Sequence, residues 1–257
     1  MGSIILRKAA VEAIEEVVAK TLQQARQRDD QVRGRVEAKL GPHEPAIEAA
    51  RAEQGVMEAR AGDAHARATY LADRAAQTVG EVADEIWNAL DRPGADVTYA
   101  MLLPGGVAFI KNEAPARQAV LMRVLAEKLR KTQDARLEQT RLDAWAERVE
   151  EGAGPLWDAA VAALAAEGRA YHARQARAHV VRTAWRELPR LKRELLNEGW
   201  SEADIHRVIP DAQRGASGAG GGGGGGTGTG TGTGTGAAVA ALAAAASGAA
   251  SSPEGGS

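Results

Sequence analysis

The sequence predicts an all-α fold made of long antiparallel helices, and three observations support this fold class. Alanine is the most frequent of the 257 residues, whereas aromatic residues make up only 4% and phenylalanine occurs once. Because alanine has the highest helix propensity and buries little area, this composition favours closely packed helices over a deep α/β core. Apolar residues also recur at seven-residue spacing over long stretches, which are separated by Gly-Pro steps.

The first two predicted helices cover about residues 3–40 and 45–90. The first carries an apolar stripe at seven-residue spacing, made of Ile4, Val11, Val18, Ala25 and Val32. It should stop at Gly41-Pro42, because proline cannot continue the helical hydrogen-bond ladder. The second carries an alanine-lined heptad seam, made of Met57, Ala61, Ala64, Ala68, Leu71 and Ala75. Such a seam is typical of closely approaching helices.

Two further long helices are predicted at about residues 115–151 and 156–197. The sequence Gly152-Ala153-Gly154-Pro155 should separate them, and a short cap helix should follow at about 201–209, begun by Ser201. If the chain reverses at both main breaks, the four helices form an antiparallel bundle. If the helices continue past the breaks, they form one coiled-coil hairpin with two long arms. We favour the bundle, because both breaks contain helix-stopping residues.

The connector at about residues 92–113 is the least helical part of the chain. Residues 97–103 and 107–110 are apolar and flank Pro104-Gly105-Gly106, which predicts a short β-hairpin between the second and third helices. A two-stranded hairpin is marginal alone in water, so it should lie on another part of the fold.

Composition divides the chain near residue 214. Residues 1–213 are expected to form one elongated helical bundle that includes the connector and the cap helix. Residues 214–257 are dominated by glycine, threonine and alanine, including a glycine run at 220–226. We expect this second part to be a flexible, disordered tail, because it has too few apolar side chains to form a core.

No residue pattern predicts catalysis or a bound cofactor. The chain has no cysteine, which excludes disulfides, thiolate nucleophiles and cysteine-ligated metals. Its five histidines do not occur in a Glu-x-x-His or His-Glu-x-x-His pattern, so we expect no metal site. We infer no catalytic residue, no cofactor and no small-molecule substrate. The N-terminus lacks a signal peptide and arginine exceeds lysine, so we expect a cytoplasmic, bacterial protein.

The connector supplies the candidate protein interface, which consists of Val97, Tyr99, Met101, Leu103, Val107 and Phe109. Exposed apolar residues of this kind often bind a partner or a second copy of the same chain. Two alternatives remain open. The same side chains can instead fold down and close the end of the bundle, or the hairpin can insert into a membrane.

The fourth helix supplies a second candidate surface. Arg182, Arg186, Arg190 and Arg193 share one helical face, which could contact nucleic-acid phosphates or an acidic partner. However, residues 143–167 are rich in acid, and the chain has a net charge of -2. We therefore expect these arginines to form salt bridges within the chain or between subunits.

Together, the sequence predicts a non-enzymatic structural, scaffold or adaptor protein. It should act through its helical faces and its apolar connector, and it should associate with itself or with a protein partner. A nucleic-acid-associated protein that uses the arginine face is the main alternative, and a membrane-active protein is a weaker one.

Overall fold

The structure is a computed structural model that describes residues 10–28, 31–92 and 96–210. The regular elements formed by these residues are all helices and include no strand, which confirms the all-α prediction. The elements in chain order are α1 (Val11–Arg26), α2 (Gln31–Leu40), the 3-10 turn η1 (Gly41–His43), α3 (Glu44–Ala89), α4 (Val97–Leu102), α5 (Gly106–Lys111), α6 (Pro115–Lys131), α7 (Gln139–Asn197) and α8 (Glu202–Val208).

The chain divides into two units, residues 1–214 and 215–257. The first unit contains every described element. The second unit, with most of the tail predicted at 214–257, lies outside the described residues.

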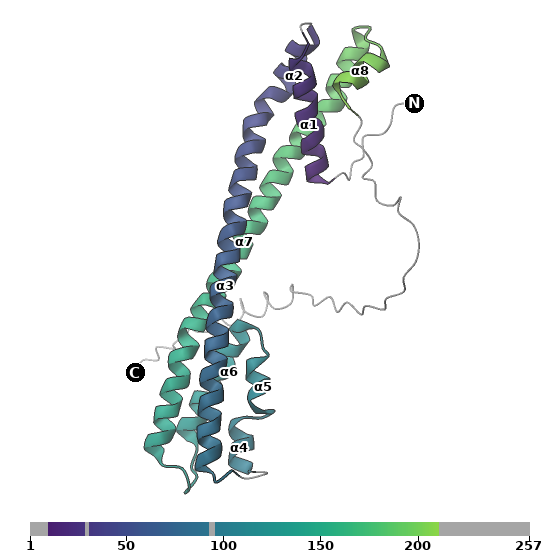
Figure 1. The fold of residues 1–257 in the computed structure, drawn as a ribbon. Coiled ribbons are helices and arrows are strands. Elements are labelled where there is room, and N and C mark those ends of the chain that lie inside the picture. The colour runs from purple at the N-terminus through teal and green to yellow at the C-terminus, as the bar shows by residue number, and fades with distance from the viewer. Residues whose placement is uncertain (1–9, 29–30, 93–95, 211–257) are drawn as a thin grey trace, which may run out of the picture. The chain divides into compact units, whose positions relative to one another are not determined.

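Two long antiparallel helices, α3 and α7, are the framework of the first unit and run side by side (Figure 1). Their partners follow opposite numbering, because Glu58 of α3 pairs with Arg174 of α7, whereas Glu85 pairs with Arg148. At 1.5 Å per residue the two helices are about 70 and 90 Å long. The second predicted helix, at 45–90, is confirmed almost residue for residue by α3.

Alanine fills the middle of the α3–α7 contact. Ala61 packs with Ala166 and Ala170, and Ala68 packs with Ala159 and Ala163. Ala61, Ala68 and Ala75 are 9%, 3% and 2% exposed, so the predicted alanine seam of this helix does face its neighbour. Small side chains let the two backbones approach closely, although each alanine buries little apolar area.

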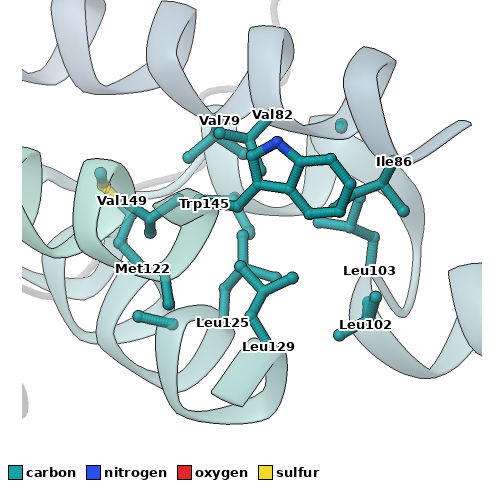
Figure 2. Packing of buried hydrophobic residues seen from close by; sticks show 14 of the residues in the cluster. Val79, Val82, Ile86, Leu102, Leu103, Met122, Leu125, Leu129, Trp145 and Val149 are labelled. Carbon is teal, nitrogen blue, oxygen red and sulfur yellow. The ribbon is translucent and has the colours of Figure 1, made fainter. Parts of the chain in front are cut away.

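A large core lies where α7 begins. Side chains of α3 to α7 meet around Trp145, which is 3% exposed and lies among Val79, Val82 and Ile86 of α3 (Figure 2). The indole Nε1 donates a hydrogen bond to Glu85 Oε2 at 2.6 Å. The five tryptophans include further anchors, because Trp157 packs on this core and Trp185 and Trp200 pack on the second one.

A second large core lies at the other end of α7. There α1, α2 and α8 pack on residues 181–195 of α7, and the predicted stripe residues Val18, Ala25 and Val32 are fully buried. The cap helix predicted at 201–209 is confirmed by α8, whose Ser201 Oγ accepts a hydrogen bond from the Asp204 backbone N–H at 3.2 Å.

The prediction of one continuous first helix is wrong. Residues 3–40 were expected as one helix, but the described part forms α1 and α2, which pack against each other. The stripe from Val11 to Val32 nevertheless faces one core, because burial rather than backbone continuity sets which side chains turn inward. Ile4, at the start of the same stripe, lies outside the described residues.

The predicted break at 152–155 is also wrong. Helix α7 runs through Gly152, Pro155 and Pro189, because Ala153 and Leu156 are fully buried and their packing outweighs the lost backbone donor. The chain reverses earlier, between α6 and α7 at residues 132–138, where Leu137 N–H bonds to Asp134 O at 2.9 Å. The four-helix bundle is therefore not seen, since the described part contains two long helices with shorter ones at each end.

Candidate functional site

The predicted β-hairpin connector is wrong, because its described residues form the short helices α4 and α5. Asp96 caps α4, and its Oδ1 accepts a hydrogen bond from the Tyr99 backbone N–H at 3.0 Å. At the start of α5, the cap residue Gly105 and the first helical residue Gly106 have φ values of 83° and 75°, which glycine adopts without strain. The apolar residues thus follow a helical period rather than a two-residue alternation.

This helical period sorts the six predicted interface residues into two groups. Tyr99, Leu103 and Val107 pack into the first core, where Figure 2 shows Leu103 beside Ile86. Leu103 is 2% exposed, and Tyr99 contacts Trp87 edge to face with ring centroids 5.1 Å apart. Burial raises the pKa of the Tyr99 hydroxyl, and the negative charge of Asp84 adds to this effect. The first alternative, in which Val97, Tyr99, Met101 and Leu103 fold down on the core, therefore holds for Tyr99 and Leu103 but not for Val97 and Met101.

The other three predicted residues face solvent. Val97, Met101 and Phe109 are 77%, 68% and 42% exposed. Two valines of the neighbouring helix α6, Val120 and Val124, are exposed as well. We call these five side chains the α4–α6 patch. The α6 members were missed in the sequence, although their four-residue spacing places both on one face of a helix that has its core on the other.

A small cavity lies beside Phe109 and Val124 of the α4–α6 patch. Its volume is about 40 Å³, and its walls include Leu102, Phe109, Val124 and Lys128. Lys128 Nζ donates a hydrogen bond to the Met101 carbonyl at 2.8 Å, which ties α6 to the end of α4. Cofactor and drug-sized ligand sites usually enclose about 300–1,000 Å³, so this cavity fits at most one small aliphatic group of a partner.

A hydrogen-bonded charge cluster holds α4 in place. Arg136, in the turn between α6 and α7, pairs with Asp96 at 2.8 Å and with Asp134 at 2.7 Å. Thr98 Oγ1 of α4 donates to Asp134 Oδ2 at 2.7 Å. Hydrogen bonding from Arg136 holds the pKa of Asp134 far below its usual range and lowers that of Asp96 too. The cluster therefore fixes the helix that carries Val97 and Met101.

The four arginines of the predicted nucleic-acid face are all exposed on α7. Arg190 Nη1 pairs with Glu187 at 2.7 Å, and Arg193 Nε donates to its own helix at the Pro189 carbonyl. Within the described part of the chain, Arg182 and Arg186 form neither a hydrogen bond nor an ion pair.

Other arginines of the same charge run are used inside the fold. Arg177 is bound by Glu15 of α1 and Gln54 of α3, and Arg174 pairs with Glu58 of α3. Salt bridges within the chain were expected, but Arg190 pairs with Glu187 of its own helix, and the acidic partners of Arg177 and Arg174 come from α1 and α3 rather than from residues 143–167.

Three further properties of the described residues bear on the site. They contain no group of three or more histidine, cysteine, aspartate or glutamate side chains placed to hold a metal ion. Every buried side-chain nitrogen or oxygen among them has a hydrogen-bond partner. None of their helices combines the length and the apolar character needed to cross a membrane.

Comparisons with known proteins give no match. No protein-family model matches the chain, and no curated protein or solved structure gives a significant match to it.

Proposed function

We propose that this chain is a non-enzymatic scaffold or adaptor that binds a protein partner through the α4–α6 patch. The observation that carries the proposal is the exposure of Val97, Met101 and Phe109 beside a helix that exposes two more valines. Surface groups of large apolar side chains typically mark protein contacts, because covering them removes apolar area from water.

The support of the patch agrees with a binding role. Leu102, Leu103 and Ile110 anchor α4 and α5 in the core, so the exposed side chains are held on a fixed base. Because this surface is already ordered in the free chain, less conformational entropy is lost when a partner binds to it. The small cavity beside Phe109 suits one aliphatic side chain of that partner.

A photo-crosslinking amino acid at Met101 of the full chain tests the proposal. We expect it to capture one protein repeatedly in cells, whereas the same probe at the exposed Tyr70 of α3 should not. The captured protein is then purified and its affinity measured directly. Val97→Ser/Met101→Ser/Phe109→Ser should weaken that binding at least about tenfold, because a combined loss of about 1.4 kcal/mol over the three contacts is sufficient for this change.

The matched control is Val56→Ser/Tyr70→Ser, which removes exposed apolar side chains of α3 outside the patch. It should leave the affinity unchanged. Equal affinity of all three chains would exclude the patch as the binding surface. Thermal unfolding of each chain verifies that the patch substitutions act on binding and not on folding.

The nucleic-acid alternative has one observation in its favour, since Arg182 and Arg186 are exposed and have no ion-pair partner among the described residues. A phosphate-binding surface would show salt-dependent retention on DNA or RNA, and retention should fall in Arg182→Ser/Arg186→Ser. The scaffold proposal expects no retention at low salt. The membrane alternative depended on an inserting hairpin, and α4 and α5 take its place.

A further inference from the structure

Helix α7 carries an outer seam that faces solvent over most of its length. Its residues are separated alternately by four and three positions in the sequence, which is the spacing of one continuous helical face. They are Glu147, Glu151, Gly154, Asp158, Val161, Ala165, Gly168, His172, Gln175, His179, Arg182 and Arg186, and all are exposed except the half-buried Gly154. We call this set the outer seam.

The charges of the outer seam are separated by sign. Glu147, Glu151 and Asp158 lie in its first half, whereas Arg182 and Arg186 lie at its other end. Its middle is small or apolar, with Val161 42% exposed and Ala165 and Gly168 beside it. Leu164 and Tyr171 flank this middle and are 42% and 53% exposed.

The carboxylates and arginines of the outer seam form no hydrogen bond or ion pair within the described part of the fold, although the charge of Glu147 also acts on Arg130, which is paired with Glu150. Most charged side chains of α7 are engaged, as Arg148 is with Glu85 and Arg177 with Glu15. The charged side chains of α7 that make no hydrogen bond, ion pair or ring contact with a described residue are Glu147, Glu151, Asp158, Arg169, Arg182 and Arg186. All of these but Arg169 lie on the outer seam.

From this pattern we infer that the outer seam binds the outer seam of a second copy of the chain in antiparallel orientation. The steps of four and three residues are in the same order when the seam is followed from either end. Two seams that run in opposite directions therefore align along their full length. In this register Glu147 and Glu151 face Arg186 and Arg182 of the second copy. Ala165 faces Gly168 across the two-fold axis, where small side chains allow close approach. Each of the four charges at the seam ends thereby gains a partner of opposite sign.

A second copy fits this surface better than other occupants. A nucleic acid would be repelled by Glu147, Glu151 and Asp158, and a wholly basic or acidic peptide would match only one half. The overlap from Glu147 to Arg186 spans about 60 Å of helix, which offers a long contact. The inference deepens the proposed scaffold function by naming a surface for self-association, and this surface is separate from the α4–α6 patch.

Charge reversal tests the pairing in the full-length chain. Glu147→Lys/Glu151→Lys makes both ends of the seam basic, and Arg182→Glu/Arg186→Glu makes both ends acidic. At low salt we expect the wild-type chain to be a dimer in light scattering and each variant to dimerise at least about tenfold more weakly. An equimolar mixture of the two variants should form the heterodimer, because the basic seam then faces the acidic one.

The matched control for Glu147→Lys/Glu151→Lys is Glu48→Lys/Glu53→Lys, which changes the net charge by the same amount and sign at exposed positions of α3. It should dimerise as the wild-type chain does. A monomeric wild-type chain at its highest soluble concentration would overturn the inference. Unchanged dimerisation of both seam variants, or failure of their mixture to associate, would overturn it as well.

Orientation is tested by crosslinking, since the chain has no cysteine of its own. Gly168→Cys lies next to the predicted axis, and a Cβ there meets no atom within 4 Å. A short bismaleimide should therefore join two copies of this variant. Thr140→Cys is exposed near the start of α7, and in the antiparallel pair its two copies are about 80 Å apart. Equal or stronger crosslinking at Thr140 would contradict the antiparallel arrangement.

The two proposals fail separately in these experiments. Val97→Ser/Met101→Ser/Phe109→Ser should still dimerise through α7, although it loses its protein partner. A chain that binds its partner through the patch but stays monomeric would overturn only the inference about the outer seam.

Discussion

Gly152 of α7 lies directly against Met122 of α6, so that a Cβ at position 152 would be 3.1 Å from the Met122 Cε. This close approach explains why a glycine stands in the middle of a long helix. Met122 is fully buried, and α6 and α7 share the large core around Trp145. The glycine therefore serves helix packing at this position and not the end of a helix.

Two glycines of the long helices should respond in opposite ways to larger side chains. At Gly62, an exposed position of α3, an added Cβ has no contact within 4 Å, so Gly62→Ala should stabilise the fold by up to about 1 kcal/mol because alanine favours the helix. Gly152→Leu should destabilise it by about 1–3 kcal/mol through overpacking against Met122. Urea unfolding monitored by circular dichroism measures both values. Stabilisation by Gly152→Leu would contradict the packing role.

The position of α3 was predictable, and the course of α7 was not. The alanine seam and the flanking Gly41-Pro42 step define α3 in the sequence as local features. By contrast, Gly152 and Pro155 are unfavourable in a helix locally, and only the packing of Ala153 and Leu156 on distant residues keeps α7 continuous. Tertiary contacts of this kind leave no signal in the local sequence.

The candidate site shows a signal that the sequence did contain. Tyr99, Leu102, Leu103, Val107 and Ile110 follow steps of three, one, four and three residues, the spacing of a helical face. Asp96 is also a good helix cap. The alternation of Val97, Tyr99, Met101 and Leu103 suggested strands instead. A helical interpretation of this segment separates its exposed side chains from its buried ones, which the two-residue alternation does not.

The ion pairs of Arg136 should make the fold less stable at acid pH than at neutral pH. Its hydrogen bonds lower the pKa of Asp134 and Asp96, so the folded state favours the charged carboxylates. The resulting stability is present above the unfolded pKa of about 4, and it is lost as the pH falls below that value toward the lowered native pKa values. We expect the free energy of unfolding to fall between about pH 5 and pH 2.

Arg136→Gln provides the control for this pH dependence. It removes the guanidinium that pairs with both carboxylates, so it should be less stable than the wild-type chain at about pH 6. Its stability should also fall less steeply in acid. Denaturant titrations across this pH range measure the free energy of unfolding of both chains. If it falls equally steeply with pH in the two chains, Arg136 is not the cause of the acid sensitivity.

The alanine contact between α3 and α7 should tolerate little increase in volume. Ala68 is 3% exposed against Ala159 and Ala163, so Ala68→Leu should destabilise the fold by about 1–3 kcal/mol. Ala66→Leu lies on the exposed side of the same helix and should change stability by less than about 0.5 kcal/mol. Equal effects in urea unfolding would show that the two helices do not pack closely here.

Arg177 should be the most important arginine of α7 for stability. Its side chain is 11% exposed, its Nε donates to Glu15 at 3.1 Å, and its Nη1 donates to Gln54 at 3.2 Å. Arg177→Met should cost about 1–3 kcal/mol, because the Glu15 carboxylate, only 15% exposed, loses its closer charged partner and keeps only the exposed Arg51 at 3.9 Å.

Two further variants separate this buried pair from the surface pairs of the same helix. Arg174→Met should have a much smaller effect, since Arg174 and Glu58 are 45% and 43% exposed and water screens their attraction. Glu15→Gln/Arg177→Met should regain part of the stability that Arg177→Met loses, because the mostly buried Glu15 carboxylate is then replaced by a neutral amide. Denaturant unfolding of the wild-type chain and these three variants measures their order of stability. If Arg174→Met and Arg177→Met are equally stable, burial does not distinguish the two ion pairs.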